Sequence, residues 1–131
     1  MENTETFTIH VIGSQTGNTY TGDFKVRKFL SHRLKLQRDL RIRQLLGEIN
    51  PHVSMQQNLA GRLADCEVSI VEGPPFWDAS NGGLDLLDDN VLEEVQNHVY
   101  RIQKESIEAV QKKAKEAADK LKAEVKGDGQ G

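Results

Sequence analysis

The chain has 131 residues, of which 28% are charged, and a formal net charge of −3. This length suits one domain with a single hydrophobic core. The chain has no apolar run of the roughly 18 residues that span a bilayer, and its acidic N-terminus is unlike a signal peptide, so we expect a cytoplasmic protein. Cys66 is the only cysteine, which excludes an intramolecular disulfide, and the four histidines lack the local spacing of a zinc site.

Positive and negative side chains are separated along the chain. Residues 25–43 carry eight cations and a single carboxylate, Asp39. Residues 63–100 carry nine carboxylates and no lysine or arginine. This separation indicates that one charged surface docks on another, either within the chain or on a partner.

The first thirty residues predict an antiparallel β-hairpin. Residues 6–12 alternate and are rich in β-branched side chains. Residues 20–27 place Phe24 and Val26 on one face and Lys25 and Arg27 on the other. The connection, residues 13–19, contains glycine and asparagine residues that tolerate positive φ, so it is a suitable hairpin loop.

The same connection resembles the phosphate loop of flavodoxin-type FMN domains. The resemblance lies in the run Ile12-Gly13-Ser14-Gln15-Thr16-Gly17-Asn18-Thr19. Such loops surround a phosphate with hydroxyl and backbone N–H groups at the start of a helix. The motif needs a helix directly after the loop, but residues 20–26 alternate like a strand. We therefore expect a protein without a cofactor and keep FMN binding as the alternative.

A helix is expected from its N-cap, Ser31, to about Ile49, because Asn50-Pro51 cannot continue it. The second half of this helix is amphipathic. Arg38 falls in the middle of the apolar face. Either its aliphatic stem carries the guanidinium to water, or the guanidinium meets a carboxylate of residues 65–94.

A second helix is expected to begin at a capping box formed by Ser54 and Gln57. Its apolar stripe includes Met55, Leu63 and Cys66. Residues 67–72 then alternate as a short strand that Gly73 and two prolines end. This strand could join the hairpin as a third strand, without which the hairpin would be marginal.

Residues 74–90 are the least regular part of the chain. We expect the two prolines to hold the backbone extended and to present Phe76 and Trp77. These aromatic side chains either cap the core or, exposed beside Asp78, anchor a partner. The run Asn81-Gly82-Gly83 predicts a tight turn.

The last helix is expected to run from Val91 to about Lys126. Asn90 is its predicted N-cap, and Glu93 completes the capping box. The carboxylates of Asp88 and Asp89 are expected to interact favourably with the positive N-terminal end of the helix dipole.

This helix divides into two parts. Its first part supplies core side chains, but beyond Lys104 the apolar stripe continues more weakly through Ile107 and Val110. Such a stripe is too small to stabilise a lone helix, so the extension either frays or packs on another chain. We therefore expect a compact α+β domain at 1–103, a helical extension at 104–126 and a disordered tail at 127–131.

No set of residues with catalytic or metal-ligand spacing is present, so we expect neither an enzyme nor a small-molecule substrate. Nucleic-acid binding is not expected, since the overall pI is acidic and few aromatic residues lie among the cations. The candidate partner-binding residues are Phe76, Trp77, Asp78, Arg33, Arg38, Arg41, Ile107 and Val110.

Several stretches resemble small morphogenesis proteins of tailed bacteriophages. They are Tyr20-Thr21-Gly22-Asp23-Phe24-Lys25-Val26, Arg43-Gln44-Leu45-Leu46-Gly47, Pro75-Phe76-Trp77-Asp78-Ala79-Ser80-Asn81-Gly82-Gly83-Leu84-Asp85-Leu86 and Asp88-Asp89-Asn90-Val91-Leu92. Residues 19–100 are similar to tail assembly chaperones, and the resemblance assigns no site residues.

The resemblance implies a non-enzymatic factor that acts in the cytoplasm of the bacterial host. Such a factor binds the tape measure protein and brings tail tube subunits to it. Self-association of the chain is a separate expectation. The principal alternative is a structural virion component of head, neck or tail, which would use the same surfaces as subunit contacts.

Overall fold

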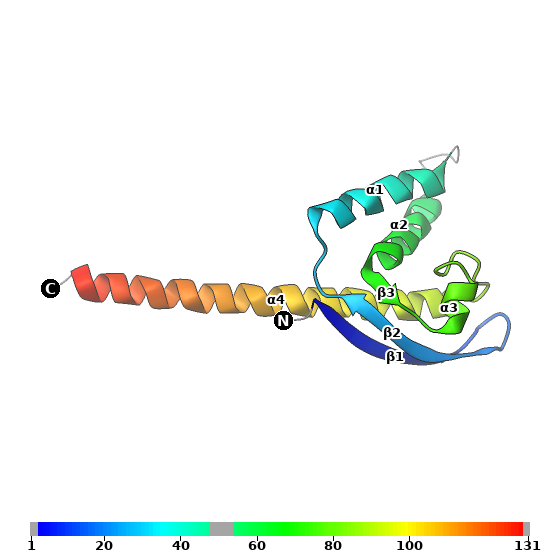
Figure 1. The fold of residues 1–131 in the computed structure, drawn as a ribbon, viewed down its shortest axis with the longest axis horizontal. Coiled ribbons are helices and arrows are strands. Elements are labelled where there is room, and N and C mark those ends of the chain that lie inside the picture. The colour runs from blue at the N-terminus through cyan, green and yellow to red at the C-terminus, as the bar shows by residue number, and fades with distance from the viewer. Residues whose placement is uncertain (1–2, 48–53, 130–131) are drawn as a thin grey trace.

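The computed structural model describes residues 3–47 and 54–129, with the backbone alone at 54–57 and 125–129. Its elements are β1 (Thr4–Ile12), β2 (Thr19–Arg27), α1 (His32–Leu46), α2 (Ser54–Ser69), β3 (Ile70–Glu72), α3 (Pro75–Ala79) and α4 (Asp89–Gly129). The strands form one antiparallel sheet in the order β1-β2-β3, and α4 runs past it (Figure 1). The predicted α+β class, with a hairpin, a third strand and a long C-terminal helix, is confirmed.

The sheet has one apolar face and one polar face. β1 and β2 pair along their whole length, from Thr4 opposite Arg27 to Ile12 opposite Thr19. Because side chains alternate along each strand, one face carries the buried residues Phe7, Ile9, Phe24 and Val26. The other face is polar and exposed, with Thr8 donating to Asp23 and His10 hydrogen-bonded to Thr21.

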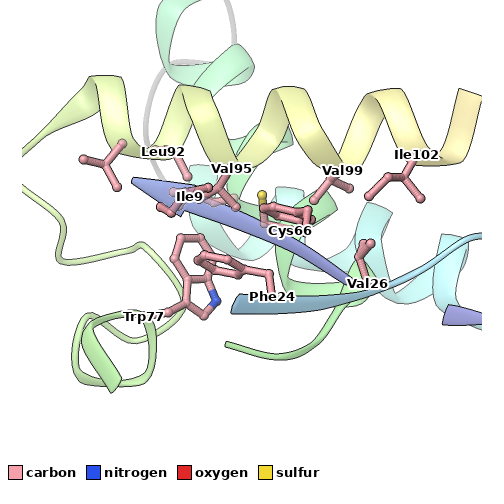
Figure 2. Close-up of a cluster of buried hydrophobic side chains, with 12 residues drawn as sticks. Ile9, Phe24, Val26, Cys66, Trp77, Leu92, Val95, Val99 and Ile102 are labelled. Carbon is pink, nitrogen blue, oxygen red and sulfur yellow. The ribbon is translucent and has the colours of Figure 1, made fainter. Parts of the chain in front are cut away.

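The first part of α4 covers the apolar face of the sheet. Its buried side chains are Val91, Leu92, Val95, Val99 and Ile102. Figure 2 shows α4 side chains directed toward Ile9, Phe24 and Val26, with Cys66 of α2 beside them. These residues recur every three or four positions, so they form one stripe of the helix. This stripe ends at Ile102.

Trp77 belongs to this core. Its side chain is 5% exposed and meets the ring of Phe24 edge-on, with the centroids 5.4 Å apart (Figure 2). A Cβ at Gly83 would lie 2.8 Å from the indole ring, so the turn after α3 needs a glycine where the backbone crosses Trp77. The hypothesis that an exposed Trp77 anchors a partner is therefore wrong, and the core alternative holds.

The two prolines explain how Trp77 becomes buried. Pro74 is extended, as expected, but Pro75 lies at the first position of α3, where a proline needs no backbone N–H. The resulting helical turn directs Trp77 into the core and leaves Phe76 half-buried against Tyr20, while Asp78 is exposed. The prediction that the prolines hold residues 76–77 in an extended conformation is therefore wrong, because these residues form a short helix.

The predicted third strand is shorter than expected. Residues 67–69 belong to α2, and only Ile70–Glu72 pairs with β2. Long-range contacts favour this longer helix: Arg27 donates to the carbonyl of Val68, and Gln103 donates to the hydroxyl of Ser69. The last carbonyl groups of a helix have no donor within the helix and need one from elsewhere. Here the donors come from distant residues, so the local sequence pattern could not predict where α2 ends.

α1 packs on α2 and has no buried residue (Figure 1). The predicted N-cap is confirmed, because the Ser31 hydroxyl accepts from the backbone N–H of Leu34 at 3.2 Å. α1 ends at Leu46, because Gly47 caps it with a positive φ of 51° and donates its N–H to the carbonyl of Arg43, so the predicted run to about Ile49 is too long. The predicted stop at Asn50-Pro51 lies outside the described residues. The side chains of the predicted capping box at 54–57 also lie outside them.

α4 is longer than predicted at both ends, since it begins at Asp89 and continues to Gly129. Residues 127–129, expected as part of a disordered tail, are helical. Within the described ranges, no helix is long and apolar enough to cross a membrane.

Replacement of the buried indole tests the core assignment. We expect Trp77→Ala to lower the free energy of unfolding by about 3 to 5 kcal/mol, because it leaves a large cavity against Phe24. Leu87→Ala is the matched control, since Leu87 is exposed and its loss should change stability by less than about 0.5 kcal/mol. Urea unfolding measures both variants. Equal stabilities of the two would contradict the placement of Trp77 in the core.

Candidate functional site

The hairpin loop, residues 13–18, surrounds an anion that belongs to the protein itself. Asp88, which precedes α4, is buried. Its Oδ1 accepts from the backbone N–H groups of Gln15 and Thr16, at 2.7 and 2.9 Å. Its Oδ2 accepts from the hydroxyls of Thr16 and Tyr20, at 2.6 and 2.7 Å. Both carboxylate oxygens are therefore fully engaged.

Asn90 strengthens the same link. Its side-chain oxygen accepts from the N–H of Ser14, and its amide nitrogen donates to the carbonyl of Ile12, both at 2.9 Å. The prediction that Asn90 caps α4 with Glu93 is wrong, because these long-range contacts occupy the Asn90 side chain. The backbone carbonyl of Asp88 instead accepts from Val91 at the helix start.

The resemblance of this loop to an FMN phosphate loop has a structural basis. Its N–H and hydroxyl groups do bind an anionic group near a helix N-terminus, but that group is the carboxylate of Asp88. A Cβ at Gly13 would overlap this carboxylate, which explains why glycine occupies that position. β2 follows the loop where the FMN motif has a helix. The donors that a phosphate would need are already used, so the loop does not support the FMN alternative.

Asp88 is ionised at neutral pH. Its pKa is held well below the usual range, chiefly by the hydrogen bond from the Thr16 hydroxyl and further by the bonds from Tyr20 and the two N–H groups, while burial opposes the shift. A carboxylate with a lowered pKa stabilises the fold at pH values above its unfolded pKa of about 4. This contribution is lost as the pH falls further.

We expect Asp88→Asn to destabilise the protein at pH 7, because the amide keeps one acceptor and loses the charge. The difference from the wild type should shrink as the pH falls below about 4, because the Asp88 carboxyl then takes up a proton in the unfolded chain while the folded state keeps it ionised to lower pH. Chemical unfolding at several pH values measures this. Asp89→Asn is the matched control, since Asp89 is adjacent and exposed. Parallel pH profiles for the wild type and Asp88→Asn would contradict the assignment.

The predicted docking of charged surfaces occurs in part within the chain. Nε of Arg38 lies 3.3 Å from Asp39 and 3.6 Å from Asp65, and Nε of Arg41 lies 2.8 Å from Glu67. Arg38 thus meets a carboxylate of the acidic stretch, one of the two alternatives for this residue. Burial raises the pKa of Asp65 although Arg38 opposes the shift. All these groups are partly exposed, so each pair contributes at most about 1 kcal/mol.

The other predicted partner-binding residues remain accessible. Arg33 is exposed near the start of α1. On α4, Ile107 and Val110 are 45% and 52% exposed. The same row continues with Ala114, Ala117 and Leu121, all exposed. α4 therefore presents an apolar row beyond the domain, in the yellow-orange to orange part of the helix in Figure 1.

A groove at the base of this row brings separate parts of the chain together. It has a volume of about 290 Å³ and lies between the start of α1 and α4. Its lining residues are Lys28, Phe29, Leu30, Lys35, Arg38, Gln103 and Ile107. Arg38 and Ile107, both predicted from the sequence, thus line one groove, whereas Phe76, Trp77 and Asp78 lie in α3 and do not contribute.

Sequence reasoning missed most of this lining. Phe29 and Leu30 lie in the connection between β2 and α1, where the sequence shows neither the alternation of a strand nor the periodicity of a helix. Tyr100 does not line this groove but lies beside it on α4 and is 61% exposed. It precedes Ile107 by one heptad, a spacing that could have identified it. Among the described residues, no three His, Cys, Asp or Glu side chains gather as metal ligands.

Comparisons with protein-family models, with curated proteins and with solved structures gave no match to this chain.

Proposed function

We propose that this chain is a non-enzymatic protein-binding factor, most like a tail assembly chaperone of tailed bacteriophages. In this proposal it acts in the bacterial cytoplasm, binds the tape measure protein and helps to recruit tail tube subunits. The single observation that carries the protein-binding part is the uncovered apolar row of α4 around Ile107 and Val110. The phage assignment rests on the sequence resemblance of residues 19–100.

The apolar row has the character of a reversible binding site. A helix that buried this row would remove Ile107, Val110 and Leu121 from water, which favours association. Ala114 and Ala117 permit close approach of a second helix but add little apolar area. The resulting affinity should be moderate, as a chaperone that later releases its client requires.

A permanent structural role in the virion is the second candidate, and the arm formed by α1 and α2 favours it. α1 has no buried residue, and its Leu36 and Leu40 side chains are exposed. A subunit of head, neck or tail needs contacts with several neighbours, and this second accessible apolar surface would supply one of them.

The fate of the protein during assembly separates the two candidates. We expect quantitative mass spectrometry to find the chain bound to the tape measure protein in lysates of infected cells and absent from purified mature particles. The pair of substitutions Ile107→Asp and Val110→Asp should reduce recovery of the tape measure protein at least about tenfold, since it places charges in the apolar row. Stoichiometric presence in mature particles would instead establish the structural role.

A further inference from the structure

The apolar row on α4 follows a heptad repeat, and all its members except the half-buried Gln103 are exposed. Its members, at alternating spacings of three and four residues, are Tyr100, Gln103, Ile107, Val110, Ala114, Ala117 and Leu121, and we call this face the α4 seam. At roughly 100° per residue, the α4 seam is turned by about 100° from the buried stripe that ends at Ile102. The two rows are therefore distinct, and the α4 seam begins beside the domain.

A strict three-and-four spacing is the pattern of a helix that packs against one other helix. A membrane-surface helix instead presents a wide face of bulky apolar residues. The α4 seam is narrow, and two of its positions are alanines, Ala114 and Ala117. Its geometry therefore fits a helical occupant.

The edges of the α4 seam carry positive charge. The positions that flank it are Lys104, Ser106, Gln111, Lys113, Ala118 and Lys120, so three of the six are lysines and none is acidic. Of the carboxylates of this part of α4, Glu105, Glu116 and Asp119 lie on the opposite side of the helix. Glu108 lies closer, outside the edge positions, and lines a hollow together with Ile107 and Gln111. Edge positions select the partner of a helix pair through their charges.

The base of the α4 seam is positive as well. The groove between α1 and α4 has Phe29, Leu30 and Ile107 as apolar lining and is flanked by Lys28, Lys35 and Arg38. A second hollow of about 370 Å³ lies along the α4 seam between Tyr100 and Gln111. The two hollows share Gln103 and Ile107, so they form one continuous surface.

Gln103 fixes the position of this surface relative to the domain. Its amide donates to the carbonyl of Arg27 at 3.1 Å and to the hydroxyl of Ser69 at 2.9 Å. Lys104 lies over the ring of Tyr100, with its nitrogen 5.8 Å from the ring centroid. The start of the α4 seam is thus held by the folded domain, and a docking helix would meet a preformed end.

A second copy of this chain fits the α4 seam poorly. In a parallel pair, an edge residue faces the partner's edge residue five positions further on, which places Lys113 opposite Ala118. In an antiparallel pair, residues of the same edge face each other, so Lys113 and Lys120 meet Ser106, Lys113 or Lys120 of the second copy. No edge carboxylate is present to match the edge lysines in either orientation, whereas carboxylates on a different helix would match them.

We propose that the α4 seam, together with the groove at Ile107, is the docking site for an amphipathic helix of another protein whose apolar stripe is flanked by carboxylates. This inference deepens the proposed function, on which it rests for the role of protein binding. It specifies the chemistry of the partner and the face of α4 that it occupies.

Designed peptides test the site without reference to any phage protein. Two helical peptides share one heptad stripe of leucine and alanine, and one carries glutamates and the other lysines at the flanking positions. We expect the full-length protein to bind the glutamate peptide at least about tenfold more tightly, as measured by fluorescence anisotropy, and to lose this preference as salt rises. Binding of this peptide would support the docking site even if the tape measure protein proved not to be the partner.

Charge reversal provides the matched comparison. Lys113→Glu with Lys120→Glu reverses the charge at two positions on one edge of the α4 seam and should invert the peptide preference. Lys115→Glu with Lys122→Glu makes the same change in net charge away from the α4 seam and should leave the preference intact. Circular dichroism confirms that both variants remain folded.

Four outcomes would overturn the proposal. They are equal binding of the two peptides, equal effects of the two double variants, dimerisation of the protein that the glutamate peptide does not displace, and binding to anionic lipid vesicles without any preference between the peptides.

Discussion

The structure depends on a mismatch of length between the sheet and the helix that covers it. Strands of nine residues span about 30 Å, whereas the 41 residues of α4 span about 60 Å. The sheet can therefore cover only the first part of α4. The buried stripe accordingly ends at Ile102. Just beyond it, Gln103 still donates to Arg27 and Ser69, and Ile107 lines the groove beside α1. From Val110 onward the helix lies beyond the domain and is stabilised by contacts within the helix alone. An isolated helix of this composition is only marginally stable in water. Contact with a partner would therefore stabilise the distal part, which the domain does not reach.

The contacts of Asp88 and Asn90 determine which side of α4 becomes available. They bind the hairpin loop to the start of the helix, and at the other end of the domain Gln103 binds β2 and α2. With both ends of the covered segment held, α4 cannot rotate about its axis against the sheet. The α4 seam is consequently directed toward the cationic groove beside α1 rather than toward the polar face of the sheet.

The sequence predicted the elements that depend on neighbouring residues. The hairpin, the cap at Ser31 and the long last helix follow from alternation, capping chemistry and helical periodicity. The contacts of Asp88 could not be predicted in the same way. Its partners Gln15 and Thr16 lie more than seventy residues away, and its local pattern also fits a helix start.

Trp77 illustrates the same limit, since only the packing of α3 on the sheet decides between burial and exposure of its side chain. Of the candidate site, the apolar row at Ile107 and Val110 was predicted, but the groove joins segments that only the tertiary fold brings together.

Amide hydrogen exchange along α4 tests the central claim most directly, namely that the domain stabilises only the first part of this helix. In the free protein, the account predicts slow exchange at residues 95–102 and fast exchange at residues 110–124, with the distal amides becoming protected when the glutamate-flanked peptide is added. Uniformly slow exchange along the whole helix in the free monomer would contradict it, because the distal part would then be stable without a partner.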